Sequence, residues 1–243
     1  MISIIIPALN EEKYLPLLLE SVKKQKFGVP SGSYEIILAD AGSKDKTLEI
    51  AKKYNCKIIP GGLPAKGKNE GAKIAKGDIL FFADADIFLP DNFFKKATTE
   101  FNERKLDIAS FCLIPVPRSK ISSFFLNVFY NKPIVLLESV LPHAAMGIFV
   151  KRELFEKIGG FDEDIKLSED HYLARRAKKL FKAKFGIIKS TEIFVSDRRF
   201  KTDGWILTGI KFLLCELHMI FIGPVKSDIF KYKFGHYEDK TKN

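Results

Sequence analysis

The chain has 243 residues, a length that suits one globular domain or two closely joined ones. Its content of 46% hydrophobic residues and 11 prolines excludes a disordered or collagen-like protein. Forty basic against thirty acidic side chains give a net charge of +10, which is typical of proteins that bind phosphates, polyanions or anionic membrane surfaces.

Three cysteines predict neither a disulfide framework nor a C-x-x-C site, because Cys56, Cys112 and Cys215 lie far apart. The apolar run at the N-terminus has no cationic segment before it and soon reaches Asn10 and Glu11. We therefore expect a strand there rather than a signal peptide, and a cytoplasmic protein.

Short apolar strands alternate with helices in the first hundred residues. Expected strands cover residues 2–6, 33–39, 56–59 and 78–83, and expected helices cover 11–25, 44–54, 68–75 and 91–102, with Ser43 as the N-cap of the second helix. Such alternation predicts βαβ units, and hence an α/β fold with a mostly parallel sheet and right-handed crossovers.

The pattern is less regular after residue 105. Further strands are expected at 106–114, 145–150 and 185–196, and a helix at 169–181. Between them lies an aromatic-rich stretch, residues 121–137, which Lys132 and Pro133 are expected to break. We predict that its aromatic side chains, Phe124, Phe125, Phe129 and Tyr130, belong to a core or lid helix; a surface for a lipid or an apolar acceptor is the alternative.

Residues 205–223 form an apolar segment that contains Lys211, Glu216 and His218, so a membrane span is not expected. Five large apolar side chains recur in it at helical spacing: Ile206, Ile210, Leu213, Leu214 and Leu217. They predict a helix that packs on the domain or lies in a membrane interface, and the basic residues after it favour the interface.

Two aspartates, Asp84 and Asp86, follow the apolar strand at 78–83. Ligands of α/β sheets bind beyond the carboxyl ends of the strands, and two neighbouring carboxylates there repel each other unless a cation compensates them. A hard divalent cation, Mg²⁺ or Mn²⁺, is the expected occupant, although the same string also occurs in solvated loops.

Residues 62–69 nearly form a phosphate-binding P-loop, but Asn69 stands where that loop needs a hydroxyl group, and the segment does not follow the first strand. A P-loop hydrolase is therefore not expected. Lys66 and Lys68 near a helix start remain candidates to meet a diphosphate, with a solvated basic loop as the equal alternative.

Several motifs follow one another in the order found in family 2 glycosyltransferases of the GT-A fold. The segments that carry this resemblance are SIIIPALNEE at 3–12, ADAGSKDKT at 39–47, KNEG at 68–71, FADAD at 82–86, GIFVKR at 147–152, GGFD at 159–162, EDHYL at 169–173 and SDRRF at 196–200. The resemblance covers roughly residues 2–204, and the ordered series is far more specific than any single motif.

This resemblance implies a GT-A domain over residues 1–204, with a nucleotide-sugar half at 1–90 and an acceptor half at 91–204, followed at 205–243 by a helix and basic tail. It also implies an inverting, metal-dependent transfer of one sugar from a nucleotide diphosphosugar to an acceptor hydroxyl or lipid phosphate. We expect peripheral contact with the inner face of the cell membrane and no nucleic-acid partner.

Roles for individual residues follow by the same resemblance. Asp86 would bind the metal ion, and Asp170 would be the general base. The residues implied in nucleotide-sugar binding are Pro7, Ala8, Leu9, Glu11, Asp40, Lys68, Asn69, Asp84 and Ala85, and those implied in acceptor or diphosphate binding are Glu169, Arg198 and Arg199. Because Glu169 and Asp170 open a predicted helix, we expect its N-terminal dipole to keep Asp170 ionised.

Two departures from the family pattern affect these expectations. Ala41 stands where many members carry a second acidic residue, which affects the contacts expected for the base of the donor. The Gln-x-x-Arg-Trp pattern of processive synthases is missing, so one sugar per encounter is expected. His171 is expected on a helix surface rather than as a metal ligand, and a solvated turn is the alternative for Arg198 and Arg199.

Two other functions would account for part of the sequence. A non-catalytic basic protein that binds nucleic acid or an anionic membrane would explain the charge, but no nucleic-acid-binding motif is present, and most of the 22 phenylalanines lie in apolar runs. A nucleotidyltransferase that makes nucleotide sugars would be expected to carry a glycine-rich loop after the first strand, where residues 7–12 read PALNEE.

Overall fold

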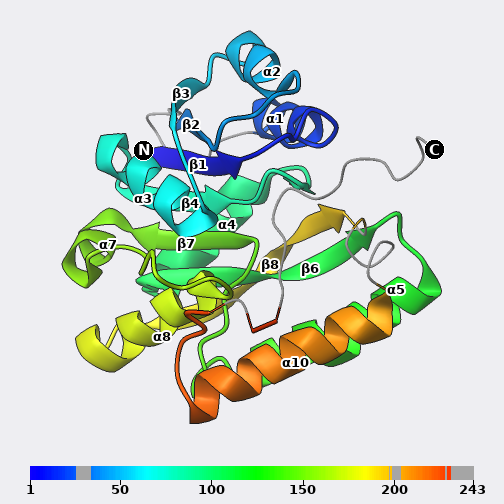
Figure 1. The fold of residues 1–243 in the computed structure, drawn as a ribbon. Helices are drawn as coiled ribbons and strands as arrows, with labels where there is room; N and C mark the ends of the chain where they lie inside the picture. The colour runs from blue at the N-terminus through cyan, green and yellow to red at the C-terminus, as the bar shows by residue number, and fades with distance from the viewer. Residues whose placement is uncertain (26–33, 197, 199–203, 228, 231–243) are drawn as a thin grey trace.

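One mixed sheet of eight strands organises the computed structural model, which describes residues 1–25, 34–196, 198, 204–227 and 229–230. The strand order is β3-β2-β1-β4-β7-β6-β8-β5 (Figure 1). The strands are β1 (Ile2–Ala8), β2 (Tyr34–Asp40), β3 (Lys57–Pro60), β4 (Ile79–Ala83), β5 (Ile87–Phe88), β6 (Ile108–Val116), β7 (Gly147–Lys151) and β8 (Phe185–Ser196).

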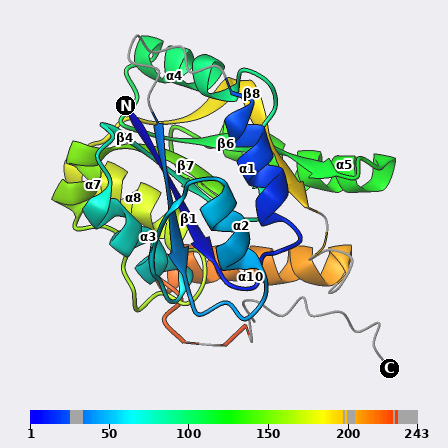
Figure 2. The same ribbon diagram turned by 90° about the horizontal axis from the view of Figure 1, so that it is seen from above.

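The first four strands are parallel to one another, as their continuous apolar runs predicted. Alternate side chains of β1 enter two different cores. Ile4 and Ile6 pack in a core that includes helices α1 (Leu15–Lys23) and α4 (Phe93–Glu103), while Ile5 packs in a core with α3 (Pro64–Ile74). Helices therefore cover both faces of the sheet (Figure 2).

The remaining strands, β5 to β8, join the parallel strands through an antiparallel pair, β4 and β7. Strand β7 runs antiparallel to both β4 and β6, β6 pairs parallel with β8, and the short β5 pairs antiparallel with β8. The fold class predicted from the sequence is confirmed, with two elements added that its patterns did not predict. These are β5, which has only two residues, and helix α7 (Arg152–Ile158).

Two helix starts differ from the expected positions. Helix α3 begins at Pro64, four residues early, because proline is well suited to a first helical turn. Helix α2 (Thr47–Lys53) begins after Lys46, so Ser43 is not its N-cap. The Ser43 hydroxyl instead accepts a hydrogen bond from the backbone N–H of Asn10, at 2.9 Å.

The aromatic-rich stretch is helical throughout, as α5 (Lys120–Leu126), the π-helical segment η1 (Asn127–Asn131) and α6 (Lys132–Leu136). The expected break at Pro133 is wrong, because this proline lies in the first turn of α6. The predicted core position is also wrong for Phe124 and Phe129, whose exposed fractions are 60% and 67%.

Helix α10 (Trp205–Phe221) turns its apolar side chains outward. The exposed ones include Ile210, Leu213, Leu214 and Leu217, whereas Thr208 and Cys215 are buried against the domain. The side chain of Ile206 and the basic tail from 231 onward lie outside the described residues. Among the described residues, no helix is long and apolar enough to cross a membrane.

Helix α3 lies so close to β1 that residue 71 has no room for a side chain. A Cβ atom at Gly71 would collide with Ile5, which is fully buried. We expect Gly71→Ala to lower the free energy of unfolding by about 1–3 kcal/mol, the usual cost of overpacking, in urea denaturation. Gly209→Ala on α10 is the matched control, because a Cβ there meets open space and alanine favours the helix. Equal stability of the two variants would contradict this packing.

Candidate active site

A cleft of about 450 Å³ opens at the carboxyl ends of β1 and β4, where ligands of α/β sheets bind. It brings together most of the site residues expected from the sequence. Those that line it are Pro7, Ala8, Leu9, Glu11, Asp84, Ala85, Asp86, Glu169, Asp170 and Arg198. Residues separated by almost the whole chain thus share one cavity.

The side chain of Arg198 connects both sides of this cleft. Its Nη1 and Nη2 atoms donate to the two carboxylate oxygens of Glu11 at 2.9 and 2.7 Å, and its Nε atom lies 3.0 Å from Oδ2 of Asp86. The guanidinium also lies over the ring of Tyr14, 4.6 Å from its centroid. A solvated turn is therefore wrong for Arg198, and Arg199 lies outside the described residues.

Lys68 occupies a different place from the one expected. Its side chain is only 2% exposed, and its Nζ atom donates to Asp170 at 2.6 Å and to Glu169 at 2.9 Å. The same atom is 4.0 Å from Asp84. Lys68 does not line the cleft, and three carboxylates engage its charge, so the structure does not bring this side chain to the place expected for a diphosphate.

Burial controls the ionisation of this group. Burial raises the pKa of Asp170 to about 7, and the nearby Lys68 only partly offsets it. Burial opposes the charge of Lys68, but Asp170, Glu169 and Asp84 raise the pKa of this lysine above its usual value. Burial thus opposes the effect that was expected from the helix N-terminus, which favours the ionised form of Asp170.

Glu11 is a second carboxyl group with a displaced pKa. Burial raises the pKa of Glu11 to about 7, Arg198 opposes this shift, and the charges of Asp86 and Asp84 add to it. The cleft thus gathers more negative groups than positive ones. Its acidic side chains are Glu11, Asp84, Asp86, Glu169 and Asp170, its basic one is Arg198, and Lys68 bonds to Glu169 and Asp170 without lining the cleft.

Five carboxyl groups against two cations leave a formal charge of 2 − 5 = −3 when all are ionised. A nucleotide diphosphate, itself an anion, would meet repulsion there. The excess of carboxylate oxygen suits a hard divalent cation such as Mg²⁺ or Mn²⁺, and Asp86 is one of the carboxylates that line the cleft. The residues present therefore fit the metal ion that the sequence predicted.

Asp40 and Asn69 do not line the cleft. The Oδ2 atom of Asp40 accepts the backbone N–H groups of Gly42 and Ser43, and Oδ1 is buried without a hydrogen-bond partner among the described residues. The Asn69 side chain both donates to and accepts from the backbone of Phe161, at 3.0 and 2.9 Å. Asn69 therefore fixes the loop before α8 (Glu169–Phe181), and the structure does not bring it to the cleft where the donor contact was expected.

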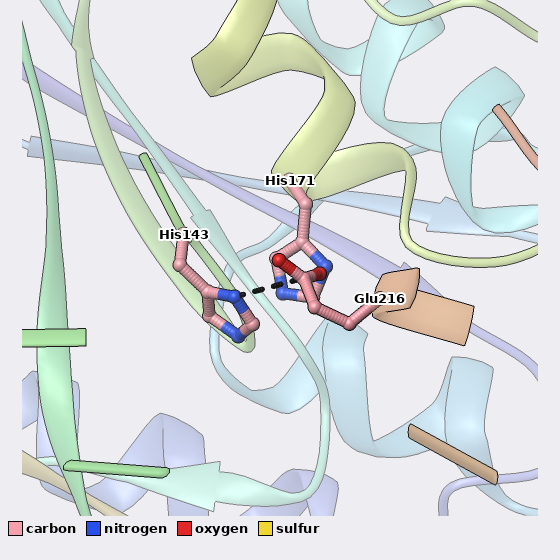
Figure 3. Close-up of side chains that lie close together, drawn as sticks. All are labelled: His143, His171 and Glu216. Atoms are coloured by element: carbon pink, nitrogen blue, oxygen red, sulfur yellow. Dashed lines mark ion pairs between the residues drawn. The ribbon is translucent and has the colours of Figure 1, made fainter. Parts of the chain in front are cut away.

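His171 lies inside the protein, with an exposed fraction of 9%, so its expected place on a helix surface is wrong. Its ring lies against that of His143, tilted by 37°, and the side chain of Glu216 from α10 lies beside them (Figure 3). Burial, helped by His143 and Arg175, holds the pKa of His171 well below its usual range. Sequence spacing gave no signal for this cluster, because its members are distant in the chain.

Comparison with known proteins shows which family the chain belongs to. The family model described as glycosyl transferase family 2 matches residues 3–159, which is more than half of the chain. The chain belongs to glycosyl transferase family 2. The expectation drawn from its ordered motifs is confirmed.

Two curated relatives illustrate the range of this family. The family 2 chain is 33% identical over 114 residues to the poly(ribitol-phosphate) beta-N-acetylglucosaminyltransferase TarS of Staphylococcus aureus (strain Mu50), covering 44% of this chain and 20% of TarS. It is 40% identical over 103 residues to a dolichyl N-acetyl-alpha-D-glucosaminyl phosphate 3-beta-D-2,3-diacetamido-2,3-dideoxy-beta-D-glucuronosyltransferase of Methanococcus voltae, covering 39% of this chain and 32% of that protein. The matched region is thus about a fifth to a third of these relatives' length.

Solved structures show that this family 2 chain has the GT-A fold. S. aureus TarS 1-349 in complex with UDP-GlcNAc is 23% identical, with a TM-score of 0.62 over 90% of this chain and 73% of that one. The mannosyltransferase PcManGT of Pyrobaculum calidifontis, in complex with GDP-Man and Mn²⁺, is 18% identical, with a TM-score of 0.70 over 88% of this chain and 61% of that one.

Proposed function

We propose that the protein transfers one sugar, with inversion, from a nucleotide diphosphosugar to a hydroxyl group of an acceptor. The observation that carries this proposal is the pairing of two carboxylate sites in one cleft. Asp84 and Asp86 follow β4, and the buried Asp170, with its pKa near 7, lies across from them at the start of α8. Such a transfer needs one site for the departing diphosphate and another for the proton of the acceptor.

The donor's base would lie over residues 7–9 and Ala41, which line one end of the cleft. Asp40 would shape the loop beside that base, because its Oδ2 atom accepts the backbone N–H groups of Gly42 and Ser43. Asp84 would face the ribose, and the guanidinium of Arg198 has the charge and planar geometry to bind the diphosphate. Family membership and the UDP-GlcNAc and GDP-Man complexes of the structural neighbours support a nucleotide-sugar donor.

A divalent cation would be held by Asp86, where it would neutralise charge that develops on the leaving diphosphate. Arg198 lies on that carboxylate in the structure, so we expect the cation and Arg198 to compete for Asp86. The Mn²⁺ in the complex of PcManGT supports this choice of ion.

Asp170 would take the proton of the acceptor hydroxyl while the acceptor oxygen bonds to the anomeric carbon and the bond from that carbon to the diphosphate breaks. A carboxyl group with a pKa near 7 is well matched to this task at neutral pH. Lys68 would not touch substrate. It positions Asp170 and Glu169 by holding one oxygen of each.

The proposal is tested by calorimetry with UDP, GDP, UDP-GlcNAc and GDP-mannose, each with Mn²⁺ and with EDTA, followed by turnover assays with the donor that binds. We expect saturable binding of one nucleotide diphosphate. When an acceptor is present, we expect this diphosphate to be released from its nucleotide sugar. Absence of binding by every member of the panel would reject the donor assignment.

Asp86→Asn should remove the metal-dependent part of this binding while leaving the fold intact, because the amide lacks the charge that attracts a hard cation. Asp91→Asn is the matched control, since Asp91 is exposed and does not line the cleft. Equal affinity of the unaltered protein for the diphosphate with Mn²⁺ and with EDTA would show that the cleft works without the ion.

We further propose that the protein attaches to an anionic membrane surface at the inner face of the cell membrane. Helix α10 and the α5–α6 segment lie along the same edge of the molecule (Figure 1). Apolar side chains with exposed fractions above 40% gather on them, among them Phe124, Phe129, Leu136, Leu213 and Phe221. Exposed basic side chains stand beside them at Arg118, Lys120 and Lys132. Exposed apolar groups flanked by cations are typical of interfacial binding.

Vesicles with and without anionic lipid test this attachment. The protein should sediment with anionic vesicles at low salt, less so at high salt, and a variant with Phe124→Ser and Phe129→Ser should bind several-fold more weakly. Absence of sedimentation at low salt would exclude the attachment. A lipid-linked acceptor would fit such a surface, and the name of the M. voltae relative supports that acceptor class.

A further inference from the structure

Three side chains that the proposed transfer does not use meet at the inner side of α10 (Figure 3). His143 lies in the loop between α6 and β7, His171 in the first turn of α8, and Glu216 in α10. Each is half-buried or buried, and the three are separated by 28 and 45 positions in the chain. The fold, rather than local sequence, brings them together.

The three groups lie at distances suited to a shared ion. One ligand atom from each side chain can be chosen so that all three lie within 4.8 Å of one another. The Nδ1 atom of His143 is 3.9 Å from Oε2 of Glu216, and the ring centroids of the two histidines are 3.7 Å apart. Ligands of a tetrahedral zinc ion, each about 2.0–2.2 Å from the metal, are roughly 3.3 Å apart, so side-chain movements of about 1 Å would complete the site.

His171 supplies the observation that points to a ligand. Its side chain is buried, and neither of its ring nitrogens has a hydrogen-bond partner among the described residues. Buried polar atoms without a partner are rare in folded proteins, and each needs an explanation. The Oε2 atom of Glu216 has no hydrogen-bond partner there either.

A neighbouring arginine already orients the carboxylate. The guanidinium of Arg175 on α8 contacts the other oxygen, Oε1, of Glu216. Oε2 is thereby left on the side of His143. Carboxylates that bind metal ions are commonly held by such an outer partner, which fixes their direction.

We infer that His143, His171 and Glu216 form a binding site for one zinc-class divalent ion beside the carboxylate cleft, whose lining includes His171. Two imidazoles and one carboxylate form a borderline donor set, which zinc and related late first-row ions prefer over Mg²⁺. Three protein ligands leave a fourth position for water or for an oxygen of a bound molecule.

The ion fastens α10 to the acceptor half of the domain. It joins α10 to the first turn of α8, where His171 directly follows Asp170, and to the loop before β7. His171 also lines the main cleft, so the ion would lie beside the proposed base without sharing its carboxylates. Loading of the site should therefore raise the melting temperature of the protein.

The test uses the Asp86→Asn background, so that the nucleotide site contributes little to metal binding. After chelator treatment and dialysis, Zn²⁺ is titrated by calorimetry, and the bound metal is counted by atomic emission. We expect about one Zn²⁺ per chain, no competition from a large excess of Mg²⁺, and a melting temperature that rises with zinc.

Single variants then locate the ion. His143→Gln and His171→Gln should each weaken zinc binding by more than about 100-fold, because loss of an outer partner alone costs 10–100-fold. His218→Gln is the matched control, since His218 lies on α10 but bonds to the Gly223 carbonyl and should leave zinc binding unchanged. Circular dichroism checks that each variant is folded.

Cobalt provides a second readout. Co²⁺ bound in place of zinc should give intense visible absorption typical of tetrahedral coordination, and this absorption should disappear in His143→Gln. The inference is overturned if the folded parent binds no zinc, or if the two histidine variants bind it as tightly as the parent. The first outcome would mean that His143 and Glu216 form only an ion pair. Neither outcome bears on nucleotide binding, so the two proposals fail independently.

Discussion

Asp170→Asn should lower turnover by about 10²–10⁴ with a hydroxyl acceptor, the usual worth of general base catalysis, while donor binding is retained. The variant keeps the size of the side chain and removes its ability to accept the proton. Calorimetry with the donor nucleotide and a steady-state assay separate these two effects. Near-normal turnover with a hydroxyl acceptor would exclude Asp170 as the base.

A phosphate acceptor would give a different result. It is already ionised, needs no base, and should keep near-normal turnover in Asp170→Asn. The same variant therefore reports the acceptor class when both kinds of acceptor are supplied. Glu169→Gln is the matched comparison, because Glu169 shares Lys68 with Asp170 but has no assigned proton transfer.

The pH profile provides an independent check on the base. Since Asp170 must be ionised to accept a proton and its pKa is raised to about 7, kcat/KM should rise with pH and level off above about 7. In Asp170→Asn the remaining activity should lose that rise. A profile that is flat between pH 5 and 8 in the unaltered protein would argue against this assignment.

The contribution of Asp170 to folding stability should fall with rising pH, whereas its contribution to kcat/KM rises. The folded pKa of Asp170 is above the unfolded value of about 4, so the folded state binds more protons between about pH 4 and pH 7. Its contribution to stability is complete below that window and is lost as the pH rises through 7. The stability of Asp170→Asn relative to the unaltered protein should therefore increase with pH across this range.

The parts of the fold that were predictable are those with local causes. The continuous apolar runs of β1, β2 and β4 mark strands buried on both faces, and the two aspartates after β4 mark the ligand edge of the sheet. The antiparallel pairing of β7 with β4 joins segments that are distant in the chain, and sequence periodicity does not indicate such pairing.

The electrostatics of the site were not predictable for the same reason. Lys68 reads as a basic residue of a glycine-rich loop, but its partners are 101 and 102 positions away. The apolar face of α10 is a second feature whose surroundings could not be predicted from the sequence. Helical spacing predicted that Ile210, Leu213 and Leu217 share a face, but not whether that face meets the domain or its surroundings.

Lys68→Met should be the most destabilising of the single substitutions considered. Lys68 is buried and holds Asp170 at 2.6 Å and Glu169 at 2.9 Å. Removal of the cation leaves two carboxyl groups beside each other without compensation, a loss that costs about 3–5 kcal/mol for buried pairs. The free energy of unfolding from urea titration at neutral pH measures this effect.

Lys73→Met on the same helix is the matched control. The Lys73 side chain is 65% exposed and forms an ion pair with Glu70 within one turn, so its loss should change stability by less than about 0.5 kcal/mol. Adding Asp170→Asn to Lys68→Met removes one of the stranded carboxyl groups and should recover part of the lost stability. If the double variant is no more stable than Lys68→Met alone, charge compensation by Lys68 is not what stabilises the start of α8.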